Sequence, residues 1–270
     1  MDRGYPLSVP VRTGPELAWH EYVDARVRDV AMSFGAREAQ YSALIATEVL
    51  AQAEYPRAFP HLLLVAGRYP LRDTGVPPPE LPSIETTEWC LSPAVCYHVY
   101  AQLAGSALRE PIVVTARGAC FRHECEQTPG VRQVEFAMRE VVLLGAPDWV
   151  NASAPSVAHA IETLARELGL EGDWRAATDP FFLPMAEGKA ALQRLAKTKH
   201  EYQQRDTRLA LASVNRHGTF FSQRFHITAV NGRGVHSACI AVGLDRWCHA
   251  ARPALDAARV ASAVEEEVRS

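Results

Sequence analysis

The sequence lacks the long hydrophobic runs, the leader segment and the paired-cysteine motifs that define several protein classes. The apolar stretch at 62–66 is far too short to span a bilayer, and residues 1–20 lack the apolar region of a signal peptide. We therefore expect a cytoplasmic protein that does not contact membranes. No CxxC pair and no HExxH occur, which excludes a standard zinc finger and that class of metalloprotease. Without a secretion signal, the six cysteines are expected to be thiols or metal ligands rather than disulfides.

Positive charge is also in short supply. Lys and Arg number 28 against 31 Asp and Glu, so the formal net charge is -3. Proteins that grip nucleic acid usually carry a basic face that neutralises phosphates, and this composition argues against such a partner. The 270 residues, 48% of them hydrophobic, are ample for an extensive core. We expect residues 1–270 to form a single globular domain.

Hydrophobic periodicity gives a coarse secondary structure. Apolar residues recur near every 3.6 positions in four segments, which predicts helices at 15–33, 37–54, 156–169 and 185–204. An Ala-rich segment from Ala251 onward predicts another helix. Strand-like runs lie at 111–115, in parts of 132–144 and at 219–230. Strands that flank a helical block predict an α+β fold, in which helices flank a mainly antiparallel sheet.

The chemically most informative segment is a charged hairpin at 119–140. Phe121-Arg-His-Glu124 closes one expected strand, a turn containing Pro129-Gly130 follows, and a second strand contains Arg132 and Phe136. The segment resembles motif 2 of class II aminoacyl-tRNA synthetases, although an Arg-x-Glu hairpin alone is more often an ordinary charged hairpin. The resemblance implies that Arg122 holds the α-phosphate of ATP, Glu124 reads the adenine amino group and Phe136 stacks on the adenine. Guanidinium groups bind phosphate in bidentate fashion and aromatic rings offer a stacking face, so these residue types suit ATP, with Arg132 as a further nucleotide-binding candidate.

Two further segments strengthen the resemblance by their order along the chain. Residues 236–250 contain Gly243-Leu-Asp-Arg246 and resemble motif 3, in which the glycine lets the backbone approach the nucleotide and Arg246 clamps the γ-phosphate. The tetrapeptide alone is a weak signal, but it follows the motif 2 candidate in the expected order. Residues 37–61, expected to be a helix that runs into a proline-rich stretch, resemble motif 1. That likeness implies a homodimer, although a helix followed by proline is common.

Cys96, Glu140 and Cys239 come from distant parts of the chain, and their positions resemble the zinc site of methanogen-type seryl-tRNA synthetases and of their truncated relatives, the amino acid:[carrier protein] ligases. The resemblance implies that the substrate's amino group takes the fourth zinc position, as expected of a site with three protein ligands. Cys90 is the alternative for the first ligand. Taken singly, each cysteine is more often a buried small hydrophobe, and that interpretation is kept for the others, Cys120, Cys125 and Cys248.

The resemblance implies a two-step reaction that uses zinc and ATP with magnesium. A small amino acid (glycine, alanine or serine) becomes an aminoacyl-adenylate and is then transferred to the phosphopantetheine thiol of a carrier protein. About 35 residues precede the motif 1-like segment, which leaves no expected tRNA-binding domain. Alternatives are transfer to a free amine or to tRNA, and a non-catalytic binding protein, although the latter predicts lost motif arginines.

A helical insertion is expected between motifs 2 and 3, at 155–204. Its helix at 185–204 is the candidate for carrier docking, with the alternative that it is simply a solvated amphipathic face. The cations available for docking are Lys189, Arg194, Lys197 and Lys199. Ala210 or Ala212 stands where the synthetases carry a magnesium-binding Glu, so no magnesium ligand is assigned, and Ser213 and Asn215 are contributors to the pocket or structural residues.

Overall fold

A computed structural model describes residues 11–68, 84–179 and 198–251 of the chain. The fold contains two long helices. α1 (Gly14–Ser33) and α5 (Pro147–Glu167) each carry proline in their first two positions and an acidic residue in the first turn, both of which favour a helix N-terminus. Each helix is followed by a glycine with positive φ, Gly35 at 75° and Gly169 at 73°, a conformation that ends helices at little steric cost for glycine.

The centre of the molecule is a seven-stranded sheet with the order β1-β6-β7-β12-β10-β9-β8. All neighbouring strands in it are antiparallel except β1 and β6, which run parallel. The mainly antiparallel sheet predicted from the sequence is therefore confirmed. Its strands are β1 (Arg37–Glu38), β6 (Ile112–Phe121), β7 (Glu135–Gly145), β8 (Gly172–Ala176), β9 (Lys199–Gln204), β10 (Ala210–Gly218) and β12 (His236–Gly243).

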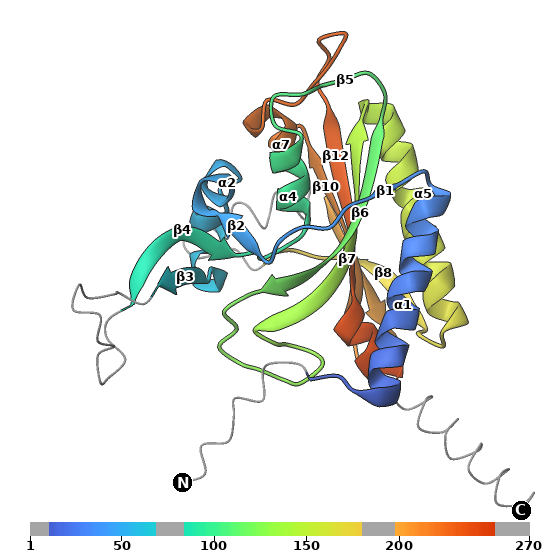
Figure 1. The fold of residues 1–270 in the computed structure, drawn as a ribbon. Coiled ribbons are helices and arrows are strands. Elements are labelled where there is room, and N and C mark those ends of the chain that lie inside the picture. The colour runs from blue at the N-terminus through green and yellow to red at the C-terminus, as the bar shows by residue number, and fades with distance from the viewer. Residues whose placement is uncertain (1–10, 69–83, 180–197, 252–270) are drawn as a thin grey trace, which may run out of the picture.

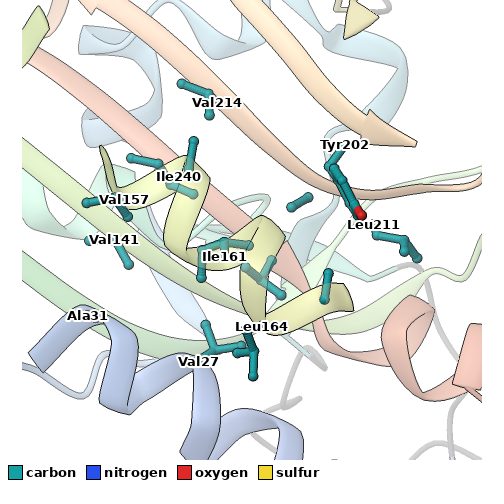
Figure 2. Close-up of a cluster of buried hydrophobic side chains, with 14 of the residues drawn as sticks. Val27, Ala31, Val141, Val157, Ile161, Leu164, Tyr202, Leu211, Val214 and Ile240 are labelled. Carbon is teal, nitrogen blue, oxygen red and sulfur yellow. The ribbon is translucent and has the colours of Figure 1, made fainter. Parts of the chain in front are cut away.

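One face of this sheet forms the main core. Helices α1 and α5 lie side by side on this face (Figure 1). Figure 2 shows side chains of both helices meeting those of the central strands, among them Val27, Ile161, Val141 and Ile240. Successive residues of a strand point to opposite faces, so the residues between these core positions face the other way. On β7, Val141 enters the core while Glu140 lies on the opposite face, which we call the site face.

Among the described residues, shorter elements pack on the site face. α4 (Cys96–Gln102) and α7 (Phe220–Arg224) pack on it through Val99, Tyr100 and Phe221. A second sheet of three antiparallel strands, in the order β2-β4-β3, lies beside it (Figure 1). The remaining elements are β2 (Leu44–Ala46), α2 (Thr47–Gln52), α3 (Tyr55–Ala58), η1 (Pro60–Leu62), β3 (Val65–Arg68), β4 (Glu85–Leu91), β5 (Ala107–Leu108) and β11 (Thr228–Ala229).

The helices predicted at 15–33 and 156–169 are confirmed by α1 and α5, but three other expectations are wrong. Residues 37–54 form two short strands and the six-residue helix α2 rather than one long helix. Most of 219–230, expected to be a strand, is α7 and the turn after it. The last residues of the expected helix at 185–204 form β9, so the block between the hairpin and β12 is not wholly helical.

Two predicted segments lie outside the described residues. They are 185–197, the first part of the helix expected at 185–204, and the C-terminal helix expected beyond Ala251. The homodimer stays a prediction, and the long motif 1-like helix expected at 37–54 no longer supports it.

A buried ion pair ties α1 to the sheet. Arg139 donates from Nε and Nη2 to the two carboxylate oxygens of Asp24, at 2.6 and 2.9 Å, and from Nη1 to Glu38 at 3.1 Å. The Arg139 and Asp24 side chains are 5% and 9% exposed, so removing either partner takes the closest counter-ion from a buried charge. A second cation, Arg117, lies 3.6 Å from the Asp24 carboxylate. The bidentate geometry therefore fixes α1 and β1 against β7.

We predict that Arg139→Ala lowers the free energy of unfolding by about 3–5 kcal/mol, because the buried Asp24 would lose its bidentate partner and keep only the more distant Arg117. The matched control is Arg26→Ala on α1, the helix that carries Asp24. The Arg26 side chain is 37% exposed, and its partner Glu167 lies 2.7 Å away. An exposed pair of this kind contributes no more than about 1 kcal/mol. Urea denaturation of both variants measures the difference, and equal losses would contradict the role given to the buried pair.

Candidate active site

A cavity of about 600 Å³ opens on the site face, and every site residue predicted from the sequence lines it. These residues come from the loop after β6, from β7, from the start of α4, and from β12 and the helical segment that follows it. They are Cys96, Arg122, Glu124, Arg132, Phe136, Glu140, Cys239, Gly243 and Arg246. The cavity therefore joins the proposed metal ligands and the proposed nucleotide ligands in one continuous space.

At one part of the cavity, two thiols and a carboxylate are packed together. The potential ligand atoms of Cys96, Glu140 and Cys239 all lie within 4.8 Å of one another, and the three residues are buried. The Cys239 thiol donates to Glu140 Oε2 at 2.9 Å. The same carboxylate accepts hydrogen bonds from the backbone N–H groups of Val95 at 2.9 Å and Cys96 at 3.0 Å. We call this set the Cys–Glu–Cys group.

Strand register explains how these distant residues meet. On β12, Cys239 and Ala241 pair with Val142 and Glu140 of β7, so the cysteine and the glutamate lie one step apart on the same face. The third member arrives with the loop before α4. A Cβ at Gly118 on β6 would lie 2.9 Å from a methyl of Val95, closer than such contacts normally are. Glycine at this position therefore lets the loop carry Cys96 down onto Glu140.

The environment of the group disfavours free thiolates. The pKa of Cys239 is raised well above its ordinary value, first by the hydrogen bond between Cys239 and Cys96, then by burial and by the Glu140 carboxylate. The bond with Cys239 lowers the pKa of Cys96, but burial and Glu140 outweigh it and leave that pKa raised. Three acidic groups thus share a buried space, and a bound cation would compensate the charge that their ionised forms carry.

The donor set fits zinc. Two thiolates and one carboxylate are ligands that zinc accepts, and three protein ligands beside a cavity leave a position for substrate. The alternative ligand, Cys90, is excluded by its place in the fold. It is fully buried in the core of the small sheet, where its sulfur lies 3.6 Å from the Thr47 hydroxyl. Cys120 is likewise buried in a core cluster, in line with its interpretation as a small hydrophobe.

Two guanidinium groups face the rest of the cavity. Arg122 donates from Nε and Nη2 to the Pro93 carbonyl at 3.2 and 3.1 Å, and its guanidinium lies 5.0 Å from the centre of the Phe136 ring. Arg246 donates to the carbonyls of Val131 at 2.8 Å and Ala210 at 3.0 Å. Burial and then the nearby Arg122 lower the pKa of Arg246. Both groups nevertheless stay cationic at neutral pH, so this part of the cavity attracts anions.

The remaining nucleotide candidates surround these arginines. Glu124 and Arg132 form an ion pair at 3.8 Å at the end of the β6–β7 hairpin, which confirms the hairpin predicted from the sequence. Gly243 is not required by packing, because an added Cβ would meet its nearest neighbours at an ordinary 3.6 Å. The absence of a side chain there instead leaves space in the cavity, as expected where a ligand approaches the backbone.

The structure also brings in residues that the sequence did not assign to the site. Lys199 on β9 lines the cavity and is held by Asp179 at 2.7 Å and Glu201 at 3.1 Å. Its side chain is only 11% exposed, so the expectation that it offers a surface charge for carrier docking is wrong. Its position could have been found from strand alternation once 199–204 was read as a strand, because Lys199 and Glu201 pair with Asn215 and Ser213.

A histidine is another polar group of the cavity that the sequence did not assign. His217 lines the cavity, and its Nδ1 lies 3.0 Å from the Tyr100 hydroxyl. Burial lowers the pKa of His217 to about 4, so the ring is neutral at neutral pH. Ser213, Asn215, Ala210 and Ala212 also line the cavity, as the sequence resemblance suggested for this segment.

Known proteins resemble the chain in sequence. An amino acid–[acyl-carrier-protein] ligase of Bradyrhizobium diazoefficiens is 32% identical over 170 residues, which cover 61% of this chain and 52% of that ligase. A second such ligase of the same organism is 31% identical over 61% of this chain and 51% of its own length. The chain is a homologue of these ligases. A type-2 serine–tRNA ligase of Methanocaldococcus jannaschii is 31% identical over 59% of this chain and 33% of its own length.

The chain thus spans about half the length of the curated ligases it matches, and no protein-family model matches it. Solved structures show the fold. The seryl-tRNA synthetase of M. kandleri, in complex with a tRNA, superposes with a TM-score of 0.76 at 22% identity over 92% of this chain and 54% of its own. A Giardia lamblia prolyl-tRNA synthetase gives 0.68 at 15% identity over 93% and 49%. The fold is that of a class II aminoacyl-tRNA synthetase catalytic domain.

The described segments contain no helix that is both long enough and apolar enough to cross a bilayer.

We predict that the purified protein contains about one zinc ion per chain and that Cys96→Ser or Cys239→Ser removes it, because each variant deletes one of three ligands. Cys90→Ser is the matched control, since Cys90 is equally buried but lies in another core. Elemental analysis measures the metal, and a chelator should lower the melting temperature of the wild type and of Cys90→Ser but not of the two zinc-free variants. Loss of zinc in Cys90→Ser with retention in Cys96→Ser would refute this ligand set.

Proposed function

We propose that the chain activates a small α-amino acid with ATP and transfers the aminoacyl group to the phosphopantetheine thiol of a carrier protein. The observation that carries the proposal is that a buried Cys–Glu–Cys group and the guanidinium groups of Arg122 and Arg246 line one cavity. A metal-binding group suits an amine, and guanidinium groups suit phosphates. The relatives named for ligation to acyl-carrier protein and to tRNA support a reaction of this class.

In the first step, a carboxylate oxygen of the amino acid attacks the α-phosphorus of ATP. The bond to the bridging oxygen breaks, and pyrophosphate leaves as the aminoacyl-adenylate forms. Arg122 holds the α-phosphate and Arg246 the γ-phosphate, so each stabilises charge that shifts during the displacement. Phe136 stacks on the adenine while Glu124 accepts from its amino group. Zinc held by the Cys–Glu–Cys group would bind the amino group of the substrate as its fourth ligand and so select α-amino acids.

In the second step, the sulfur of the carrier's phosphopantetheine attacks the acyl carbon. The bond between that carbon and the phosphate oxygen breaks, AMP leaves, and the thiol proton is lost to give a thioester. The residues beside the metal group favour a small amino acid such as glycine, alanine or serine. Tyr97 and Phe221 line the cavity there, with their rings edge to face at 5.8 Å. Large aromatic walls leave little space for a long side chain.

We predict that Arg122→Ala and Arg246→Ala each lower amino-acid-dependent ATP–pyrophosphate exchange at least about 10²-fold, because each loses a charged contact to a phosphate that changes in the reaction. Arg175→Ala on β8 is the control, since Arg175 does not line the cavity and its side chain is 46% exposed. Melting temperature and zinc content should be measured for every variant, since both cavity arginines also bind backbone carbonyls. Unchanged exchange in Arg246→Ala would remove its assignment.

We predict that radiolabelled glycine or alanine is transferred to a holo carrier protein and not to bulk tRNA. The slightly negative net charge offers no excess of cations for phosphate contacts, whereas a carrier requires only a small docking patch and access for its flexible arm. Gel filtration or acid precipitation of the labelled product measures transfer, and an apo carrier without the thiol is the control. Labelling of tRNA, or of the apo carrier, would contradict the proposed acceptor.

A further inference from the structure

Tyr55 carries a hydroxyl that has no partner in the described part of the protein. The residue is 5% exposed, and its Oη is buried without a hydrogen bond. A buried hydroxyl that loses its hydrogen bonds to water and gains none in return destabilises the fold. Phenylalanine would fill the same space without that cost. A tyrosine at this position is therefore explained most simply by a partner that binds from outside the chain.

The position of Tyr55 identifies the region in which that partner binds. Tyr55 is the first residue of α3 and lines the same cavity as the Cys–Glu–Cys group and the two arginines. Its ring packs against Phe59 at 5.1 Å and against Tyr97 at 5.6 Å, between ring centres. Of the charged groups, Arg122 has the strongest electrostatic effect on the Tyr55 hydroxyl. Tyr55 and Arg122 therefore line one cavity and lie within electrostatic reach of each other.

The backbone before Tyr55 is held in an uncommon conformation. Glu54 has φ 57°, in the left-handed region that non-glycine residues rarely adopt. Its carboxylate forms an ion pair with Arg224 at the end of α7, which anchors the turn to a second element. Strained backbone of this kind persists where the surrounding structure enforces it, and it is concentrated at binding sites. Here it directs the first residue of α3 into the cavity wall.

The chemistry of the group restricts its partner to an acceptor. Burial raises the pKa of Tyr55 to about 12, although Arg122 opposes the shift. The phenol is therefore protonated at neutral pH and can donate one hydrogen bond. Next to a guanidinium, the acceptor that both groups can share is an anionic oxygen, and a phosphoryl group supplies several such oxygens in a compact space.

We infer that the Tyr55 hydroxyl donates a hydrogen bond to the phosphoryl group that Arg122 holds, which is the α-phosphate of ATP and of the aminoacyl-adenylate. The inference rests on the proposed function, because that function places the α-phosphate at Arg122. Tyr55 is then a substrate-binding residue that contacts the phosphate at which the displacement occurs. Arg122 supplies the charge, and Tyr55 fixes the orientation of the phosphoryl oxygens.

The test compares the binding of AMP and adenosine by calorimetry in the wild type and in Tyr55→Phe. Loss of a hydrogen bond to a charged group should weaken AMP binding about 10- to 100-fold. Adenosine lacks the phosphate, so its affinity should not change. The kcat/KM for ATP in pyrophosphate exchange should fall by a similar factor. The melting temperature of Tyr55→Phe should equal or exceed that of the wild type, because an unpartnered buried hydroxyl is removed.

Tyr202→Phe is the matched control. Its hydroxyl is also buried but already donates to the Leu170 carbonyl at 2.9 Å, outside the cavity. This variant should lower the melting temperature by about 2–4 °C and leave both affinities unchanged. The inference is overturned if Tyr55→Phe binds AMP as tightly as the wild type, if it weakens adenosine equally, or if the wild type does not distinguish AMP from adenosine. If the wild type shows this phosphate preference but no amino-acid-dependent exchange, the proposed function fails while the phosphate contact stands.

Discussion

The carboxylate of Glu140 is the point on which the site depends. It accepts two backbone hydrogen bonds from the loop before α4 and one from the Cys239 thiol, so a single side chain on β7 connects that loop, β7 and β12. Glu140 is 1% exposed, and a buried carboxylate is tolerated only where such donors satisfy it. Loss of any of these three donors would leave the buried carboxylate less well solvated, so the fold keeps them in place. Hydrogen bonds within the protein thus hold Glu140 between the two cysteines of the Cys–Glu–Cys group.

The same connection reaches the phosphate side of the cavity. Pro93, whose carbonyl accepts two hydrogen bonds from Arg122, lies three residues before Cys96 in the loop that Glu140 holds. Displacement of this loop would therefore move the first cysteine and the phosphate-binding arginine together. On the opposite face of β7, the neighbouring Arg139 binds Asp24 of α1. Adjacent residues of one strand thus hold the site on one face and the helical layer on the other.

The β6–β7 hairpin and the Cys–Glu–Cys group differ in how far the sequence could predict them. The hairpin with Arg122, Glu124 and Phe136 was predicted because strand, turn and strand signals are local. The Cys–Glu–Cys group was predicted only through resemblance, since nothing in the spacing of Cys96, Glu140 and Cys239 indicates that they meet. Its assembly depends on strand register and on the close approach at Gly118, which are long-range properties.

The errors in secondary structure also have physical causes. The 219–230 segment is rich in aromatic residues, which favours a strand. Phe221 and Phe225, however, lie four residues apart and are both buried, and this is the spacing of a helix face. Residues 199–204 contain few apolar side chains because their site-face positions, Lys199 and Glu201, line the cavity instead of packing in a core. Strand patterns are weakest at the positions that form a site.

Strand geometry also limits which substrates the proposed reaction can use. Cys239 and Gly243 lie on the same face of β12, four residues apart, so their Cα atoms are separated by about 13 Å at the usual rise per residue. In the proposed reaction, the amine binds at the metal group beside Cys239 while the nucleotide lies against the backbone at Gly243, and the carboxylate must reach the α-phosphate that Arg122 holds. A packed sheet is rigid, so the distance between the two binding positions does not adjust to the ligand. The number of bonds between the amine and the carboxylate of the substrate therefore decides whether both groups reach their positions. In an α-amino acid that number is fixed whatever the side chain. In the proposed reaction, the sheet would therefore select the backbone of the substrate, and the aromatic wall formed by Tyr97 and Phe221 would select the size of its side chain.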